Sequence, residues 1–154
     1  PTIDATDRKI LSLLIRNARM PFLEIARECG ISGAAIHQRV KKMEESGVIR
    51  GFRLEVDPTA LGYNVSAMIG IRINDPSMNF EIVDGLRRIP EVVECHFVTG
   101  KYNIWTRVYC VDHEHLMHTI LDHILRVPGV SETETFISLS DSFGRQVSVR
   151  DLDQ

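Results

Sequence analysis

Apolar residues recur at helical spacing near the start of the chain. Ile10, Leu13 and Leu14 follow the i, i+3, i+4 pattern of one helical face. Asp4 precedes this pattern as a candidate N-cap, and a carboxylate there also favours the positive end of the helix dipole. The pattern ends before Pro21, because the residue before a proline is pushed out of the helical region. These features predict a first helix.

A short helical pattern over 22–29 and a longer one over 32–46 follow, and a glycine separates them. Gly30 stands where a helix needs a left-handed residue to end it, and Ser32 is a candidate N-cap for the next helix. Ala26 is small enough to let two helices approach closely. This arrangement is typical of a helix-turn-helix, whose second helix enters the DNA major groove.

The third helix divides into an apolar and a polar face. Ile36, Val40 and Met43 are expected to face inward. The polar face and its flanks carry the predicted DNA-binding residues: Ser32, Gly33, Ala34, His37, Gln38, Arg39, Lys41 and Lys42. Small residues permit close approach to the groove, the His and Gln side chains hydrogen-bond base edges, and the three cations reach phosphates. The alternative is a solvated face on an ordinary helical bundle.

From Arg50 onward the periodicity changes to the alternation that is typical of strands. Residues 51–57 predict a strand that joins two modules and ends at Pro58. A strand-helix-strand pattern then occurs twice, with a proline after each helix, at Pro90 and Pro128. The two units predict strands over 65–74, 92–98, 104–111 and 130–139 and helices over 79–89 and 113–125.

Two such units form a four-stranded antiparallel sheet with both helices on one face, the ferredoxin-like arrangement. The predicted fold class is α+β: a winged-type helix-turn-helix followed by a ferredoxin-like βαββαβ domain. We expect a helix-turn-helix domain over 1–50, a connecting strand and linker over 51–61, the ferredoxin-like domain over 62–141 and a C-terminal tail over 142–154. One sheet face is left uncovered, so we expect it to pack against a second copy of the chain.

Charge is divided unevenly along the 154 residues, whose net charge is -3. The first fifty carry nine Lys/Arg against six Asp/Glu, and the remainder carries nine against fifteen. This asymmetry favours a basic module that meets a polyanion and an acidic module that does not. No apolar run approaches the ~18 residues that span a bilayer. Three widely spaced cysteines disfavour a disulfide framework, so we expect no membrane partner and a reducing, cytoplasmic compartment.

An enzyme is the first rival class. Six histidines invite a metal hypothesis, and His115 and His118 have helical i, i+3 spacing. No Asp, Glu or His of another element is visibly positioned to complete a ligand shell, so surface histidines are the better account. No GxSxG, Walker or GxGxxG motif occurs. We therefore expect no catalytic residues, no cofactor and no metal.

A turn between two predicted strands holds candidate ligand-binding residues. Gly100 permits a positive φ, Tyr102 offers a ring with a polar end, and Asn103 both donates and accepts hydrogen bonds. Thr133 and Thr135 bring hydroxyls to one face of the final strand. Such a cluster suits a small zwitterion at a subunit edge. A plain hairpin turn beside a half-exposed strand is the alternative.

Six motifs in a fixed order cover the chain from Ile3 to about Leu139. They are IDxxDRKIL (3–11), EIARECGIS (24–32), IHQRVKKMEESGVIRGF (36–52), DPxxLGY (57–63), EVVECHFVTGKYNIWTRV (91–108) and ETETFISL (132–139). In this order and spacing they resemble the Lrp/AsnC family of bacterial and archaeal transcription regulators. AAIHQRVKKM and TETFISL are more similar to its asparagine-responsive branch.

The resemblance implies a transcription regulator that binds a pseudo-palindromic double-stranded DNA site as a homodimer, with four dimers forming an octameric ring. It also implies a small amino-acid effector, asparagine being the first candidate, held between dimers. The implied ligand-binding residues are Gly100, Tyr102, Asn103, Ile104, Thr133 and Thr135. Many members carry an aspartate where this chain has Asn103, which leaves effector identity open. The second rival is a broadly binding DNA-organising protein with no effector.

Overall fold

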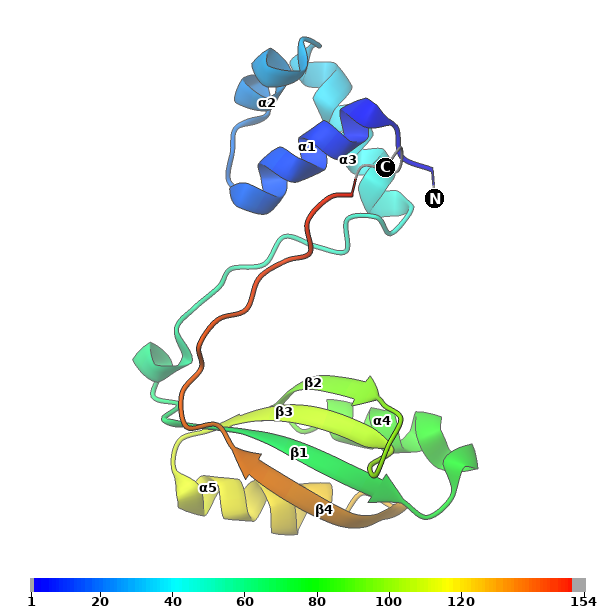
Figure 1. Cartoon of the computed structure of the whole chain (residues 1–154), viewed down its shortest axis with the longest axis vertical. Coiled ribbons are helices and arrows are strands. Elements are labelled where there is room, and N and C mark those ends of the chain that lie inside the picture. The colour runs from blue at the N-terminus through cyan, green and yellow to red at the C-terminus, as the bar shows by residue number, and fades with distance from the viewer. Residues whose placement is uncertain (1, 151–154) are drawn as a thin grey trace. The chain divides into compact units, whose positions relative to one another are not determined.

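The computed structural model describes residues 2–150 and divides the chain into two compact units. One unit contains the chain through Glu55 together with the segment that begins at Phe143, and the other spans Val56–Ser142 (Figure 1). The division thus falls inside the linker expected over 51–61. The expected tail is grouped with the N-terminal unit rather than standing apart.

The N-terminal unit is a bundle of three helices, α1 (Ala5–Arg16), α2 (Phe22–Cys29) and α3 (Gly33–Glu45). Its core contains the apolar residues that the helical spacing predicted to face inward. They are Ile10, Leu13, Leu14, Ile25, Ala26, Ile36, Val40 and Met43. The helix-turn-helix prediction is confirmed by this arrangement.

The ends of these helices have local causes in the sequence. Asp4 and Asp7 form a capping box at the start of α1, in which the Asp7 backbone N–H donates to Asp4 Oδ1 at 2.8 Å. Gly30 ends α2 with a φ of 67°, in the left-handed region that favours glycine. The Ser32 hydroxyl caps α3 by accepting from the Ala35 backbone N–H at 3.1 Å. Gly30 and Ser32 therefore determine where α2 ends and where α3 begins.

The strand predicted over 51–57 is absent, and that prediction is wrong for the single chain. Within residues 2–150, no backbone hydrogen bond joins 51–56 to another segment. Alternating apolar residues create a two-faced segment, but a strand also needs a neighbour to complete its hydrogen bonds. Leu54 at the centre of the segment remains 86% exposed. A 3-10 turn, Pro58–Leu61, follows.

The second unit is a four-stranded antiparallel sheet with the strand order β2-β3-β1-β4. Its strands are β1 (Val65–Ile73), β2 (Val92–Phe97), β3 (Ile104–Cys110) and β4 (Val130–Ile137). Its helices are α4 (Asn79–Arg87) and α5 (His113–His118), the latter continued by a π-helical turn over Thr119–Ile124. This order, with two connecting helices, is the predicted ferredoxin-like domain.

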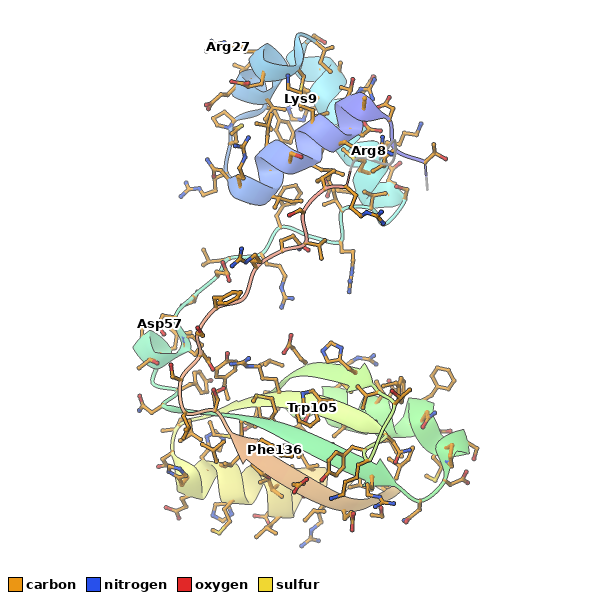
Figure 2. The ribbon with its side chains drawn as sticks, in the orientation of Figure 1. Arg8, Lys9, Arg27, Asp57, Trp105 and Phe136 are labelled. Carbon is orange, nitrogen blue, oxygen red and sulfur yellow. The ribbon has the colours of Figure 1, made fainter. Side chains whose placement is uncertain are left out.

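The two faces of the sheet differ in burial. On one face, Ile69, Ile71 and Ile104 are fully buried in a core that α4 and α5 complete. The opposite face carries the rings of Trp105 and Phe136, whose centroids lie 5.3 Å apart (Figure 2). Phe136 is 40% exposed, so an aromatic pair lies on a sheet face that no helix of this unit covers.

Candidate functional site

The structure gathers the predicted DNA-binding residues on α3 and at its N-cap. Ser32, Ala34, His37, Gln38, Lys41 and Lys42 are exposed, and Gly33 and Arg39 are half-buried. The inward face of the helix packs into the three-helix core, as its spacing predicted. The exposed strip therefore combines small, hydrogen-bonding and cationic side chains along one helix.

His37 is exposed and also packs against the preceding helix. Its ring lies edge-on to the ring of Phe22, with centroids 4.4 Å apart. Because Phe22 is the first residue of α2, this contact links the start of α2 to the side of α3. One flank of α3 is thus held by an aromatic contact.

Arg39, a predicted phosphate contact, is paired with two carboxylates in the single chain. Its Nη1 donates to both carboxylate oxygens of Asp4, at 3.0 and 2.8 Å, and to Asp7 Oδ1 at 3.0 Å. The hydrogen bond from Arg39, together with the Asp7 backbone N–H, lowers the pKa of the Asp4 carboxyl. The guanidinium is therefore already paired at the surface of the helical unit, since the fold brings the N-cap of α1 to the flank of α3.

Three further cations of the helical unit lay outside the predicted set. Arg8, Lys9 and Arg27 are on α1 and α2, and no carboxylate pairs with them in the part of the chain that the structure describes (Figure 2). Lys9 Nζ donates to the Glu28 carbonyl oxygen near the end of α2. The signal for these residues was the positive surplus of the first fifty positions.

The loop between β2 and β3 is held by Asn103. The Val98 backbone N–H donates to the Asn103 carbonyl at 3.0 Å, and the Asn103 N–H donates to the Ile71 carbonyl at 3.0 Å. The side-chain Oδ1 accepts from the Ile73 backbone N–H at 3.0 Å. Gly100, at the tip, has a φ of 104°. Asn103 thus fastens the loop to β1 through two hydrogen bonds and closes the loop on itself through a third, to Val98.

The hydrogen bond to Ile73 also decides which end of the Asn103 amide is free. Because an N–H must donate to an oxygen, Oδ1 faces β1 and Nδ2 faces away from it. Within residues 2–150 no hydrogen bond uses Nδ2. The side chain therefore presents a donor where an aspartate would present a second acceptor oxygen.

Tyr102 lies over the open face of the sheet. Its ring occupies the space above Gly70, where an added Cβ would come 2.6 Å from Cδ2. The Lys101 ammonium lies 5.5 Å from the centre of the same ring. Gly70 pairs with Trp105 on β3, so the tyrosine joins the aromatic side of the sheet.

Thr133 and Thr135 lie on the opposite, helix-covered face. They are the cross-strand partners of Ile71 and Ile69, and directly opposed residues point to the same face. Ile104 is fully buried on that face. The single chain therefore brings the loop residues and the threonines to one end of the sheet, but it separates Tyr102 from the threonines.

The histidines considered as metal ligands form hydrogen bonds within the sheet unit instead. His115 Nδ1 accepts from the Val111 backbone N–H at 2.9 Å, and its Nε2 lies 3.0 Å from Glu91 Oε1. Asp122 hydrogen-bonds His118 and raises the pKa of that imidazole. No three His, Cys, Asp or Glu side chains are grouped as metal ligands among the described residues.

A shallow hollow of about 240 Å³ lies between α4 and β2. Its lining includes Val83, Arg87 and Cys95 and none of the predicted ligand-binding residues. No helix in the described part of the chain is long and apolar enough to cross a membrane.

Two family models match the two units. Residues 3–50 match the winged helix-turn-helix DNA-binding model, and residues 66–147 match the Lrp/AsnC ligand-binding domain. The regulatory protein AsnC of Escherichia coli K12 is 36% identical over 145 residues, which cover 94% of this chain and 95% of the relative. A helix-turn-helix transcriptional regulator of Pyrococcus horikoshii is 35% identical over 137 residues, 89% of each chain.

Solved structures show the same similarity. The structure of E. coli AsnC has a TM-score of 0.86 at 35% identity, over 96% of this chain and 99% of the other. A feast or famine regulatory protein of M. tuberculosis, complexed with L-methionine, has a TM-score of 0.88 at 27% identity, over 97% of this chain and 100% of the other.

The fold and these matches define a transcriptional regulator that joins a helix-turn-helix to an amino-acid-binding domain. The chain belongs to the Lrp/AsnC family.

Proposed function

We propose that α3 reads DNA sequence and that a small amino acid bound by the sheet unit modulates this binding. The observation that carries the proposal is the exposed strip of Ala34, Gln38 and Lys41 on a helix whose inward face is locked in the core. An amide beside a small residue can reach base edges, while Lys41 and Lys42 meet phosphates. Lys9 and Arg27, on α1 and α2, add positive charge that attracts the DNA backbone, but they are not part of the strip on α3 that reads bases.

For the effector, we propose that the Asn103 amide N–H₂ donates to an oxygen of the ligand. A free α-amino acid offers its carboxylate, and asparagine offers a side-chain carbonyl as well, so asparagine remains the first candidate. The methionine in the M. tuberculosis relative supports an amino acid as the ligand class. The exposed loop tip at Gly100 leaves room for approach, since nothing lies within 4 Å of a Cβ added there.

We propose that the effector site is completed by a second copy of the chain. Tyr102 and the threonines Thr133 and Thr135 lie on opposite sheet faces, so one chain cannot direct all of them at one small molecule. The aromatic open face with Trp105 and Phe136 supports a homodimer, because such a pair is costly to leave in water. We propose that four dimers assemble into a ring and that the effector binds between dimers. We also propose that the protein acts in the cytoplasm.

The proposal predicts reciprocal coupling between the two ligands. Effector binding would change DNA affinity by about 1–3 kcal/mol, and DNA would change effector affinity by the same amount. A dimer reading two half-sites about one turn of B-DNA apart would transmit this coupling through the spacing of its two α3 helices.

The testing experiment is a thermal-shift panel of the twenty amino acids on the purified chain. A ligand present at about 100 times its dissociation constant adds ~2.7 kcal/mol to the stability of the unit that binds it. A shift with asparagine or another amino acid supports the sensor. No shift with any of the twenty, together with DNA binding that shows a steep salt dependence and little sequence preference, supports the DNA-organising protein instead.

A further inference from the structure

We propose that Arg39 is a positioning residue, which sets the rotation of α3 about its own axis and thereby the sequence preference of the protein. Asp4 and Asp7 are its anchor. The inference rests on the proposed function, because it concerns how the DNA-reading helix is held. It assigns a role in specificity to two acidic residues at the start of the chain.

Asp4 and Asp7 are also held by hydrogen bonds that do not involve Arg39. Asp4 Oδ1 accepts from the Asp7 backbone N–H at 2.8 Å, and the Asp4 backbone N–H donates to Asp7 Oδ2 at 3.2 Å. These reciprocal bonds fix both carboxylates relative to α1. Three contacts of 2.8–3.0 Å join Arg39 Nη1 to these carboxylates, which the capping box already holds to α1.

The charge balance argues against a phosphate contact by Arg39. One guanidinium lies between two carboxylates, so the local charge is negative. A DNA phosphate approaching this group gains no net attraction, and it would have to replace hydrogen bonds that are already made. The phosphate contacts are instead assigned to Lys41 and Lys42, which are exposed on the same helix.

The opposite flank of α3 is held as well. On a helix with about 100° per residue, residues 37 and 39 lie about 160° apart around the axis. His37 contacts Phe22 of α2, and Arg39 contacts the N-cap of α1. The strip with Ala34, Gln38 and Lys41 lies between these two contacts. Each contact opposes rotation of the helix in one direction.

Small rotations matter at the tips of the side chains. At a radius of about 6 Å, a rotation of about 10° moves a side-chain tip by about 1 Å. A displacement of this size takes a hydrogen bond between Gln38 and a base edge out of its range of 2.7–3.2 Å. Phosphate attraction changes little over the same distance. Loss of the anchor should therefore reduce sequence preference and spare general DNA affinity.

The test compares two duplexes of equal length and base composition. One is selected from a random-sequence library by the wild-type chain, and the other is its scrambled version. Affinities of Arg39→Gln and of the double variant Asp4→Asn with Asp7→Asn are measured across a range of salt concentrations, well below each variant's unfolding midpoint. Arg16→Gln is the matched control, because it removes the same charge from an exposed residue of α1 that has no ion pair among the described residues.

We expect Arg39→Gln and the double variant to lower the ratio of selected to scrambled affinity by at least about tenfold, and Arg16→Gln to keep the ratio. The salt slope should stay unchanged in Arg39→Gln, because the paired guanidinium contacts no phosphate. A salt slope that falls by about 0.9 in Arg39→Gln would make Arg39 a phosphate contact and overturn the inference. An unchanged ratio overturns it too, because the ion pair would then serve stability alone.

Hydrogen exchange of the α3 amides in the free protein gives a readout without DNA. We expect faster exchange over 33–45 in both variants and not in the control. Unchanged exchange in the variants overturns the inference even if the proposed function holds. A wild-type protein that prefers neither duplex would contradict the proposed reading of DNA sequence. In that case the exchange data still decide whether the anchor, Asp4 and Asp7, restrains α3 through Arg39.

Discussion

The ring of Tyr102 lies directly over Gly70, and the two residues come from different parts of the sheet unit. A Cβ on residue 70 would come 2.6 Å from Cδ2 and 2.7 Å from Cγ of the ring. Such distances are far below van der Waals contact, and Cγ is close to the ring's attachment, so the whole ring would have to move. The absence of a side chain at Gly70 therefore gives the Tyr102 ring its place on the sheet.

Replacing Gly70 with Ala should displace Tyr102 and weaken the effector response. Pushing the ring from its rotamer costs about 1 kcal/mol, so the dissociation constant of the most stabilising amino acid in the thermal-shift panel should rise about fivefold. Isothermal titration calorimetry measures this. Gly144→Ala is the control, because nothing lies within 4 Å of an added Cβ there. Equal affinities in both variants would show that the ring does not shape the site.

Replacing Asn103 with Asp should change which amino acid is bound while it preserves the loop. A carboxylate can still accept from the Ile73 N–H, and it replaces the free N–H₂ with a charged acceptor that pairs with an ammonium group. We expect the order of the twenty amino acids in the thermal-shift panel to change, with individual affinities altered by about tenfold or more. An identical order would place the selecting group elsewhere.

Replacing Lys41 with Ala should weaken binding to all DNA sequences alike. One lost phosphate contact reduces the slope of log affinity against log salt by about 0.9. The ion pair of Lys41 with Glu45 spans 4.0 Å on an exposed surface, so its loss has little effect on folding. Arg88→Ala, in the sheet unit, removes the same charge as a control. A changed sequence preference at constant slope would instead make Lys41 a base contact.

The Asp4 carboxyl should make the helical unit sensitive to acid. Its pKa is lowered in the folded state by the hydrogen bond from Arg39 and by the Asp7 N–H. The stabilisation is therefore complete above the unfolded value near 3.9, and it is lost as the pH falls through the lowered folded value. Circular dichroism during an acid titration should show a smaller loss of helix stability for Asp4→Asn than for wild type below pH ~4. Parallel curves would mean that the carboxyl does not contribute.

Much of the helical unit was predictable because its causes are local. Capping by Asp4, the left-handed turn at Gly30 and the inward spacing of Ile36, Val40 and Met43 all act within a few residues, and each was confirmed. Periodicity also predicted the order of elements in the sheet unit. The strand over 51–57 failed for the opposite reason, since a strand needs hydrogen bonds from a distant segment and none supplies them within residues 2–150.

The site depended on contacts between residues far apart in sequence. The ion pair of Arg39 with Asp4 was not predictable, because a helical wheel shows the neighbours of Arg39 on α3 but not the N-cap of α1, which lies 35 positions earlier. The free donor of Asn103 likewise follows from its bond to Ile73 on another strand.

The amino-acid sequence by itself determined two modules, their elements and the residue types on α3, because helix caps, glycine turns and hydrophobic periods are local properties. It also predicted that Thr133 and Thr135 share one face of a strand. Only the tertiary structure decided which face that is, since the pairing of β4 with β1 sets them beside the buried Ile71 and Ile69. Register and packing arise from contacts between distant segments, and these contacts divide the predicted ligand-binding residues between the two sides of the sheet.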